Sequence, residues 1–209
     1  MLQRVAFAVA GSQVEAILHL PDGETIAGVA VLPGRGGTMA DTAYLCESIA
    51  ASGIAALRFT FRVDGDALAG LADAGGAVRL LRAHPAIPQR VGVVGWSFGG
   101  AVAALAAGRD SRIRAAVLVS TPAARDYWGP AKPLAEITRT RAQVLIVRPA
   151  ADEVVAPADA DRYAAVLTQA RVRHELLTIA GADHNFTGPA ERAEMLAAVT
   201  SWLRVALVG

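Results

Sequence analysis

The sequence predicts an α/β fold with a mostly parallel sheet of about eight strands, an N-terminal antiparallel hairpin and helices on both faces. Three observations predict it. Strand-like apolar runs alternate with helical patterns along the chain, which is typical of parallel sheets built from βαβ units. Several of these runs are continuously apolar, as expected for strands buried on both faces. Hydrophobic residues make up 54% of the 209 residues, which is enough for a large core.

The N-terminal third of the chain predicts a hairpin followed by a buried strand. Two extended runs cover residues 4–10 and 15–20, and a Gly-Ser pair between them signals a turn. We expect this hairpin at one edge of the sheet. The apolar run at residues 26–33 is typical of a central strand, and a glycine-rich loop at residues 34–38 follows it.

The later elements alternate regularly. The predicted strands are short apolar runs at residues 54–61, 90–96, 113–120, 141–149 and 172–180. The predicted helices cover residues 41–52, 66–85, 97–109, 156–170 and 189–207. Gly53 ends the first helix and Pro85 the second, which Gly75 and Gly76 weaken. No linker or repeat interrupts this order, so we expect a single domain spanning residues 1–209 with no large lid or cap.

The composition excludes several classes of function. The formal net charge is +1, and no Lys/Arg cluster is dense enough to bind nucleic acid or a membrane surface. Cys46, the one cysteine, cannot form an internal disulfide and is interpreted as a small core residue. The first residues are a weak match to a signal peptide, because their apolar region is too short. We therefore expect a cytoplasmic protein, and the sequence indicates no oligomeric state.

One segment has the length of a membrane span. The 18 residues from Val91 to Gly108 carry no charge. Five of them are glycines, each of which would cost a continuous helix about 1 kcal/mol relative to alanine. A buried strand that turns into a buried helix explains the missing charge without a membrane.

The same segment contains Gly-Trp-Ser-Phe-Gly at residues 95–99, a G-x-S-x-G pattern between a predicted strand and a predicted helix. A sharp turn of this kind strains the backbone of the serine, and the flanking glycines avoid the resulting clashes. The turn exposes Ser97 at a helix N-terminus, where a developing negative charge is favoured. Ser97 is therefore the candidate nucleophile.

A serine nucleophile requires a base. His19 and His174 lie in predicted strands, and His84 lies at a helix end just before a proline. His184 alone lies in a loop after a late strand, where the carboxyl ends of parallel strands meet. His184 is therefore the candidate base.

The third catalytic group must orient the imidazole and stabilise its charged form. Asp152 follows the penultimate strand and so lies at the same edge of the sheet. Glu153 is its neighbour and competitor, and Asp183 is adjacent to His184 but is poorly placed to face it. We favour Asp152 as the acid.

An oxyanion hole needs two backbone amides directed at one point. Phe98, the residue after the nucleophile, is predicted to supply the first. The loop at residues 34–38 is predicted to supply the second, from Arg35 or alternatively from Gly34. The other interpretation of this loop is a flexible turn. A phosphate-binding loop is less consistent with it, because neither glycine-rich phosphate motif is complete.

These pieces resemble the α/β-hydrolases, and among them the small serine hydrolases of the dienelactone-hydrolase-like group. The resemblance covers nearly the whole chain and rests on motifs at residues 36–39, 56–62, 95–100, 151–155 and 181–186. It implies an α/β-hydrolase fold and a triad in the chain order Ser97, Asp152, His184. It also implies action on esters or similar acyl compounds without a cofactor or a metal. Many relatives have a histidine near Pro33, and its absence here leaves the second oxyanion donor open.

A second departure from the family lies before the acid, where many relatives have a glycine and this chain has Arg-Pro-Ala-Ala. Dienelactone hydrolases often have a cysteine nucleophile, so that activity does not carry over to this serine. We expect instead a small ester or thioester as substrate. An acyltransferase or peptidase of the same fold, or a non-catalytic binding protein, are the alternatives.

The segment at residues 121–140 is too short for the helical lid that lipases insert there. Tyr127 and Trp128 within it either line the site or pack on the domain. Arg58 and Arg62 are either surface residues or a guide for an anionic group.

Overall fold

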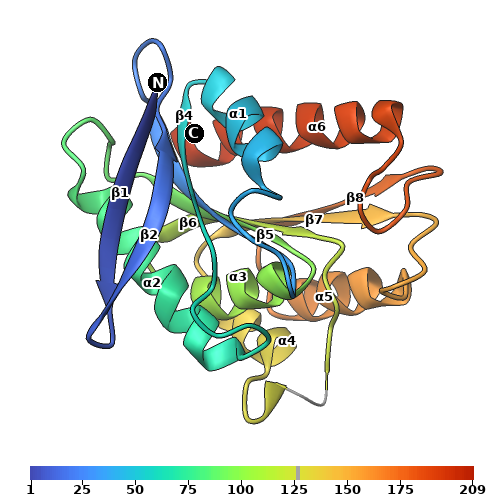
Figure 1. Cartoon of the computed structure of the whole chain (residues 1–209). Helices are drawn as coiled ribbons and strands as arrows, with labels where there is room; N and C mark the ends of the chain where they lie inside the picture. Colours follow the sequence, from blue (N-terminus) through green and yellow to red (C-terminus); the bar gives the residue numbers. More distant parts are fainter. Residues whose placement is uncertain (126–127) are drawn as a thin grey trace.

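A computed structural model describes residues 1–125 and 128–209 of the chain (Figure 1). These residues form one eight-stranded sheet in the order β1-β2-β4-β3-β5-β6-β7-β8. The strands are β1 (Leu2–Val9), β2 (Ser12–His19), β3 (Ala27–Leu32), β4 (Ile54–Phe59), β5 (Val91–Trp96), β6 (Ile113–Val119), β7 (Gln143–Pro149) and β8 (His174–Ile179). β1 and β2 pair antiparallel, as do β2 and β4, and every later pairing is parallel.

Helices cover both faces of this sheet (Figure 1). The helices are α1 (Ala43–Ala51), α2 (Ala67–Ala83), α3 (Phe98–Arg109), α4 (Pro133–Glu136), α5 (Ala158–Gln169) and α6 (Pro189–Val208), and a 3-10 turn, η2 (Ile137–Arg139), follows α4. α1 and α6 enclose one apolar core with one face of the sheet, and α2, α3 and α5 enclose the other. The predicted α/β-hydrolase fold, with its mostly parallel sheet and edge hairpin, is therefore confirmed.

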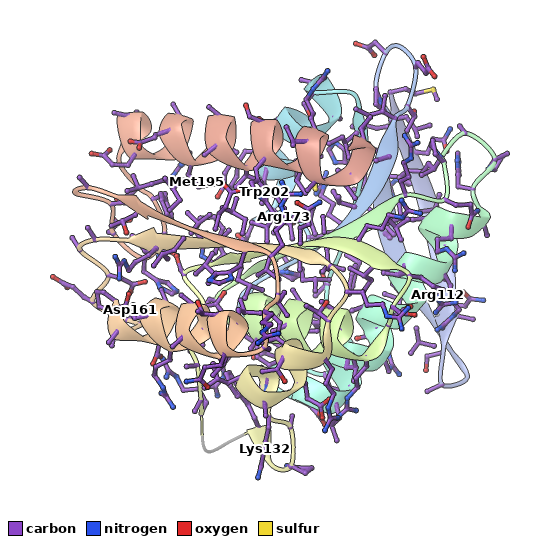
Figure 2. All side chains as sticks on the ribbon, turned by 180° about the vertical axis from the view of Figure 1, so that it is seen from behind. Arg112, Lys132, Asp161, Arg173, Met195 and Trp202 are labelled. Carbon is purple, nitrogen blue, oxygen red and sulfur yellow. The ribbon has the colours of Figure 1, made fainter. Side chains whose placement is uncertain are left out.

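α6 shows how a long helix closes one face. Figure 2 shows Met195 and Trp202 between α6 and the sheet, where Met195 is fully buried and Trp202 partly so. Charged side chains such as Arg112 and Asp161 lie at the periphery of the same view.

The hairpin turn lies one residue earlier than the Gly-Ser pair suggested. Ala10 and Gly11 occupy the two turn positions with φ of +48° and +80°, while Ser12 already pairs with Val9. Two consecutive positive φ values are the mark of the tight turn whose twist matches that of a hairpin.

α2 is continuous through Gly75 and Gly76, which the sequence indicated as a weakness. Close packing explains the glycine at position 76, because a Cβ there would lie 2.6 Å from an atom of the Phe7 ring. The helix thus approaches the hairpin more closely than any larger residue would allow. Asp66 caps its N-terminus by accepting the amides of Leu68 and Ala69.

The uncharged segment at residues 91–108 forms β5 and α3, the centre of the molecule. Every residue of β5 before Trp96 is buried, as are the first ten residues of α3. Burial on all sides explains the missing charge. In the described parts of the chain, no helix is long and apolar enough to cross a membrane.

Candidate functional site

Ser97 lies between β5 and α3 with φ of +51° and ψ of −115°. A non-glycine residue is strained at positive φ, at a cost on the order of 1 kcal/mol or more. Three glycines make the turn possible, because a Cβ at each would collide with a neighbour. A Cβ at Gly95 would strike the Gly99 carbonyl, one at Gly99 the carbonyls of Leu32 and Pro33, and one at Gly100 the Thr121 side chain.

The turn is fixed by its own backbone. The Ser97 amide donates to the Val119 carbonyl at 2.8 Å, and the Ser97 carbonyl accepts from Gly100 at 2.9 Å. Phe98 is the first residue of α3. Its amide therefore has no carbonyl acceptor within the helix and points out of the helix N-terminus. Its ring is buried and contacts Phe61 edge-on at 5.4 Å between centroids.

Asp152 and His184 form the central polar pair of this region. His184 Nδ1 lies 2.8 Å from Asp152 Oδ2, and because a carboxylate only accepts, the Nδ1 proton is the donor. The other oxygen, Oδ1, accepts the amides of Val154 and Val155, both at 2.8 Å. The Asp152 side chain is 2% exposed and that of His184 11%, so the pair is largely shielded from water.

The two competing carboxylates have other positions. Glu153 is exposed beside Asp152. Asp183 accepts the Asn185 amide at 3.1 Å and both the amide and the hydroxyl of Thr187. The hydrogen bond from the Thr187 hydroxyl is the main reason that the pKa of Asp183 lies below its usual value. Asp183 therefore shapes the loop that presents His184.

The structure brings the histidine loop next to the serine turn. The Trp96 ring, one residue before Ser97, contacts the Phe186 ring edge-on at 5.5 Å between centroids. Across residues 1–125 and 128–209, no hydrogen bond joins the Ser97 hydroxyl directly to His184. Such catalytic hydrogen bonds are often long before substrate binds and shorten in the complex.

The loop after β3 approaches Ser97 from the other side. A Cβ at Gly34 would lie 3.6 Å from the Ser97 Cβ, so this backbone passes directly over the serine. The Gly36 amide donates to Asp64 Oδ1 at 2.7 Å, which removes it from the candidate oxyanion donors. The Gly37 amide donates to the Gly34 carbonyl at 3.1 Å and closes the loop into a turn.

Arg58 and Arg62 do more than the surface or steering roles that the sequence suggested. Arg62 Nε lies 2.5 Å from Asp73 Oδ1, and Asp73 is fully buried in α2. Arg58 donates to His19 Nε2 at 2.8 Å and to the Met39 carbonyl at 2.7 Å. Both arginines therefore tie loops at this edge of the sheet to the body of the protein.

The remaining sequence candidates are structural. His84 ends α2, where its Nδ1 accepts the Ala86 amide at 3.3 Å, and His174 opens β8 with Nδ1 2.8 Å from the Val172 carbonyl. Burial raises the pKa of the Cys46 thiol, as expected for a core residue. Among the described residues, no three His, Cys, Asp or Glu side chains come together as a metal site requires.

The connection between β6 and β7 contains α4 and η2. Tyr127 lies outside the described residues. Trp128 is 4% exposed and belongs to the core, while its edge also lines a surface pocket of about 460 Å³. Arg35 and Asp64 also line this pocket, so the pocket reaches the loop that passes over Ser97.

Solved structures share this architecture at low sequence identity. The fold matches Est1E from Butyrivibrio proteoclasticus with a TM-score of 0.84 and 17% identity, covering 99% of each chain. It matches a dienelactone hydrolase from Anabaena variabilis with a TM-score of 0.80 and 20% identity, covering 99% of this chain and 98% of that one. It also matches DcsB, solved with its substrate analogue, with a TM-score of 0.86 and 16% identity over all of both chains. No curated protein matches the sequence.

A match to a sequence model of a protein family shows which family the chain belongs to. The model of the dienelactone hydrolase family matches residues 59–207. The chain belongs to the dienelactone hydrolase family. Membership in this family makes it a hydrolase acting on a small molecule. The match begins at the last residue of β4, so it includes Ser97, Asp152 and His184 but not the glycine-rich loop after β3.

Proposed function

We propose that this protein hydrolyses small carboxylic esters or thioesters through an acyl-enzyme on Ser97, without a cofactor. The observation that carries the proposal is the shielded hydrogen bond between Asp152 and His184, on loops beside a strained serine turn. An imidazole whose Nδ1 proton is held by a carboxylate presents Nε2 as the base. Ser97 is the nearby hydroxyl that such a base activates.

The chemistry runs in two balanced halves. His184 Nε2 takes the Ser97 proton while the Ser97 oxygen bonds to the acyl carbon and the carbonyl electron pair moves to its oxygen. As the tetrahedral species collapses, the bond to the leaving group breaks and His184 returns the proton to it. Water then attacks the acyl-enzyme with the same proton transfers, which releases the acid and restores Ser97.

The oxyanion is held by two amides in this proposal, those of Phe98 and Arg35, with Gly34 as the alternative to Arg35. The position of Phe98 at the start of α3 supports the first, because that amide and the helix dipole both favour an anion. The passage of the β3 loop over Ser97 supports a second donor from this loop.

The short connection between β6 and β7 supports a small substrate in this proposal. The β6–β7 connection holds one four-residue helix and a 3-10 turn in its described part, which supports a chain that acts as one domain without a large lid. A small acyl group and a small alcohol or thiol fit such a site better than a long lipid chain does.

Replacing Ser97 with alanine tests the proposal. We expect kcat for p-nitrophenyl acetate to fall by about 10,000-fold or more, because the nucleophile is lost. A fluorophosphonate probe should label the wild type at Ser97 and leave the variant unlabelled. Ser201→Ala, which removes an exposed serine of α6, is the matched control and should keep full activity. Full esterase activity in a clean Ser97→Ala preparation would contradict the proposal.

The alternatives give different products. An acyltransferase would form a new ester in the presence of an alcohol acceptor such as glycerol, with little free acid released. A peptidase would cleave an acyl-amide as readily as an ester, and a non-catalytic protein would leave the fluorophosphonate unreacted. A panel of esters, lactones and thioesters, analysed by mass spectrometry, separates these outcomes.

A further inference from the structure

Ser120 follows β6 and combines burial with an unusual backbone. Its side chain is part of a residue only 2% exposed, and its φ is +48°. Its amide still donates to the Val147 carbonyl at 3.0 Å, so the pairing with β7 extends to it. Glycine adopts such a φ without steric cost, whereas serine does not. Serine here occupies a backbone conformation that favours glycine, and its hydroxyl forms a hydrogen bond that glycine could not.

The Ser120 hydroxyl reaches across the molecule to the histidine loop. It donates to the backbone carbonyl of His184 at 3.0 Å, a bond between residues 64 apart in the sequence. The His184 side chain is anchored separately, through Nδ1, to Asp152. The residue is thus held at two points, by its main chain from β6 and by its ring from the loop after β7.

The residues on either side of Ser120 contact the serine turn. The Val119 carbonyl accepts the Ser97 amide at 2.8 Å, and the Thr121 side chain packs where a Cβ at Gly100 would be. The segment of residues 119–121 therefore contacts the serine turn through its first and last residues and His184 through Ser120.

We propose that Ser120 is a positioning residue that fixes the His184 imidazole over Ser97. The inference rests on the proposed function, in which His184 is the base for Ser97. Without the Ser120 hydroxyl, the main chain of His184 loses its link to β6 and the ring pivots about its bond to Asp152. Misplacing a catalytic group by about 1 Å can cost about 100-fold in rate.

Two substitutions separate the hydroxyl from the backbone strain. Ser120→Ala removes the hydroxyl and keeps the strain, whereas Ser120→Gly removes both. We expect kcat to fall between about 10-fold and 100-fold in each variant, while KM changes by less than about twofold. Ser52→Ala, which removes a hydroxyl bonded to the Ile49 carbonyl at 2.7 Å at the end of α1, should leave kcat unchanged. Thermal unfolding of all three variants identifies any loss of folded protein.

A second readout does not depend on turnover. In protein labelled with ¹⁵N-histidine, the His184 Nδ1 proton should give a downfield NMR signal, because it is bonded to Asp152. We expect this proton to exchange with water faster in both Ser120 variants and at the wild-type rate in Ser52→Ala. If the wild type hydrolyses no ester, the proposed function fails, and the NMR signal still decides the role of Ser120.

Three results would overturn the inference. The first is wild-type kcat in both Ser120 variants of an active enzyme, and the second is a loss confined to Ser120→Ala, which would assign the effect to strain. The third is an Nδ1 proton that exchanges at the wild-type rate in both Ser120 variants, since the hydroxyl would then not hold the histidine.

Discussion

Asp152 uses both of its carboxylate oxygens, one on the ring of His184 and one on two amides of its own loop. Asp152→Asn should keep the amide contacts through its carbonyl oxygen. Its NH₂ group, however, would face His184 Nδ1 and force the proton onto Nε2, where the ring can no longer accept from Ser97. We expect kcat to fall by about 10,000-fold at neutral pH with little change in stability.

Steady-state kinetics and urea unfolding of the variant check this expectation. Glu153→Gln, which changes the exposed neighbouring carboxylate, is the matched control and should behave as wild type. Near-normal turnover by Asp152→Asn would show that the carboxylate is not needed.

The protonation of His19 should make the free energy of unfolding depend on pH. Burial, and then the charge of Arg58, lower its pKa below 6.5, while Glu47 acts in the opposite direction. The unfolded chain therefore binds a proton more readily than the folded one does. The contribution of neutral His19 to the free energy of unfolding is complete above pH 6.5, and it is lost as the pH falls through the pKa of His19 in the folded protein.

The change that tests this is His19→Gln, whose amide oxygen can still accept from Arg58 but does not titrate. Between pH 8 and pH 5 we expect the free energy of unfolding, measured in urea, to fall less in the variant than in the wild type. Identical pH curves for the two proteins would exclude His19 as the source.

At the scale of single residues, the sequence predicts only what a local motif or a position after a strand reveals. Ser97 and His184 have such signals. Ser120 and Asp64 do not, because their roles depend on hydrogen bonds to residues 64 and 28 positions away. A serine after an apolar strand has no feature in the sequence that marks its positive φ.

α3 is the element that the site depends on most. A Cβ at Gly99 would collide with the carbonyls at the end of β3, so Gly99→Ala should force α3 and β3 apart. We expect a loss of about 3 kcal/mol in the free energy of unfolding, together with a fall in kcat as Ser97 moves. Chemical denaturation and the p-nitrophenyl acetate assay measure the two effects.

Gly75→Ala is the matched control for this helix substitution. A Cβ at Gly75 would meet only the flexible end of Arg79, at 3.5 Å. Alanine should therefore stabilise α2 by about 0.5–1 kcal/mol and leave kcat unchanged. If both alanines behaved alike, the close approach at Gly99 would not be the controlling factor.

At the scale of elements, hydrophobic periodicity and turn residues predict most helices and strands. They misplace the hairpin turn by one residue, because Ala10 takes a positive φ that alanine seldom adopts. The same sequence signals predict that Gly76 destabilises α2. Helix propensity takes no account of the Phe7 ring, against which Gly76 packs.

Across the whole molecule, four aromatic rings connect the hairpin edge to the serine turn. Phe7, Phe59, Phe61 and Phe98 contact one another in sequence, edge to face, at 5.3, 5.5 and 5.4 Å between centroids. Phe7 is the member farthest along this row from Ser97. We expect Phe7→Ala to cost about 3–5 kcal/mol in the free energy of unfolding through the cavity it leaves.

In Phe7→Ala, kcat per folded molecule should stay within about twofold of the wild-type value, because cavities relax locally and distant sites are usually independent. Leu2→Ala, which truncates an exposed residue of the same strand, should change neither quantity. A large fall in kcat for Phe7→Ala at a temperature where the variant is folded would instead mean that the row transmits displacement to the Phe98 amide.

The alternation of strands and helices predicts a parallel sheet, but it does not give the order of the strands. β4 lies between β2 and β3 although β3 precedes it in the chain, and no local pattern of residues records this order. The order matters for the site, because it places β3 beside β5 and so brings the glycine-rich loop over Ser97.

The close packing of α3 has a consequence for evolution and for enzyme engineering. Substitutions at Gly95, the residue before Trp96 in β5, or at Gly99 or Gly100 in α3 meet backbone or buried side chains at once, so libraries directed there should yield mostly inactive clones. The walls of the pocket beside the β3 loop, such as Leu68 and Pro130, carry no such constraint from the turn. New substrate ranges should therefore arise from substitutions in these pocket walls, while the centre of the enzyme stays nearly invariant.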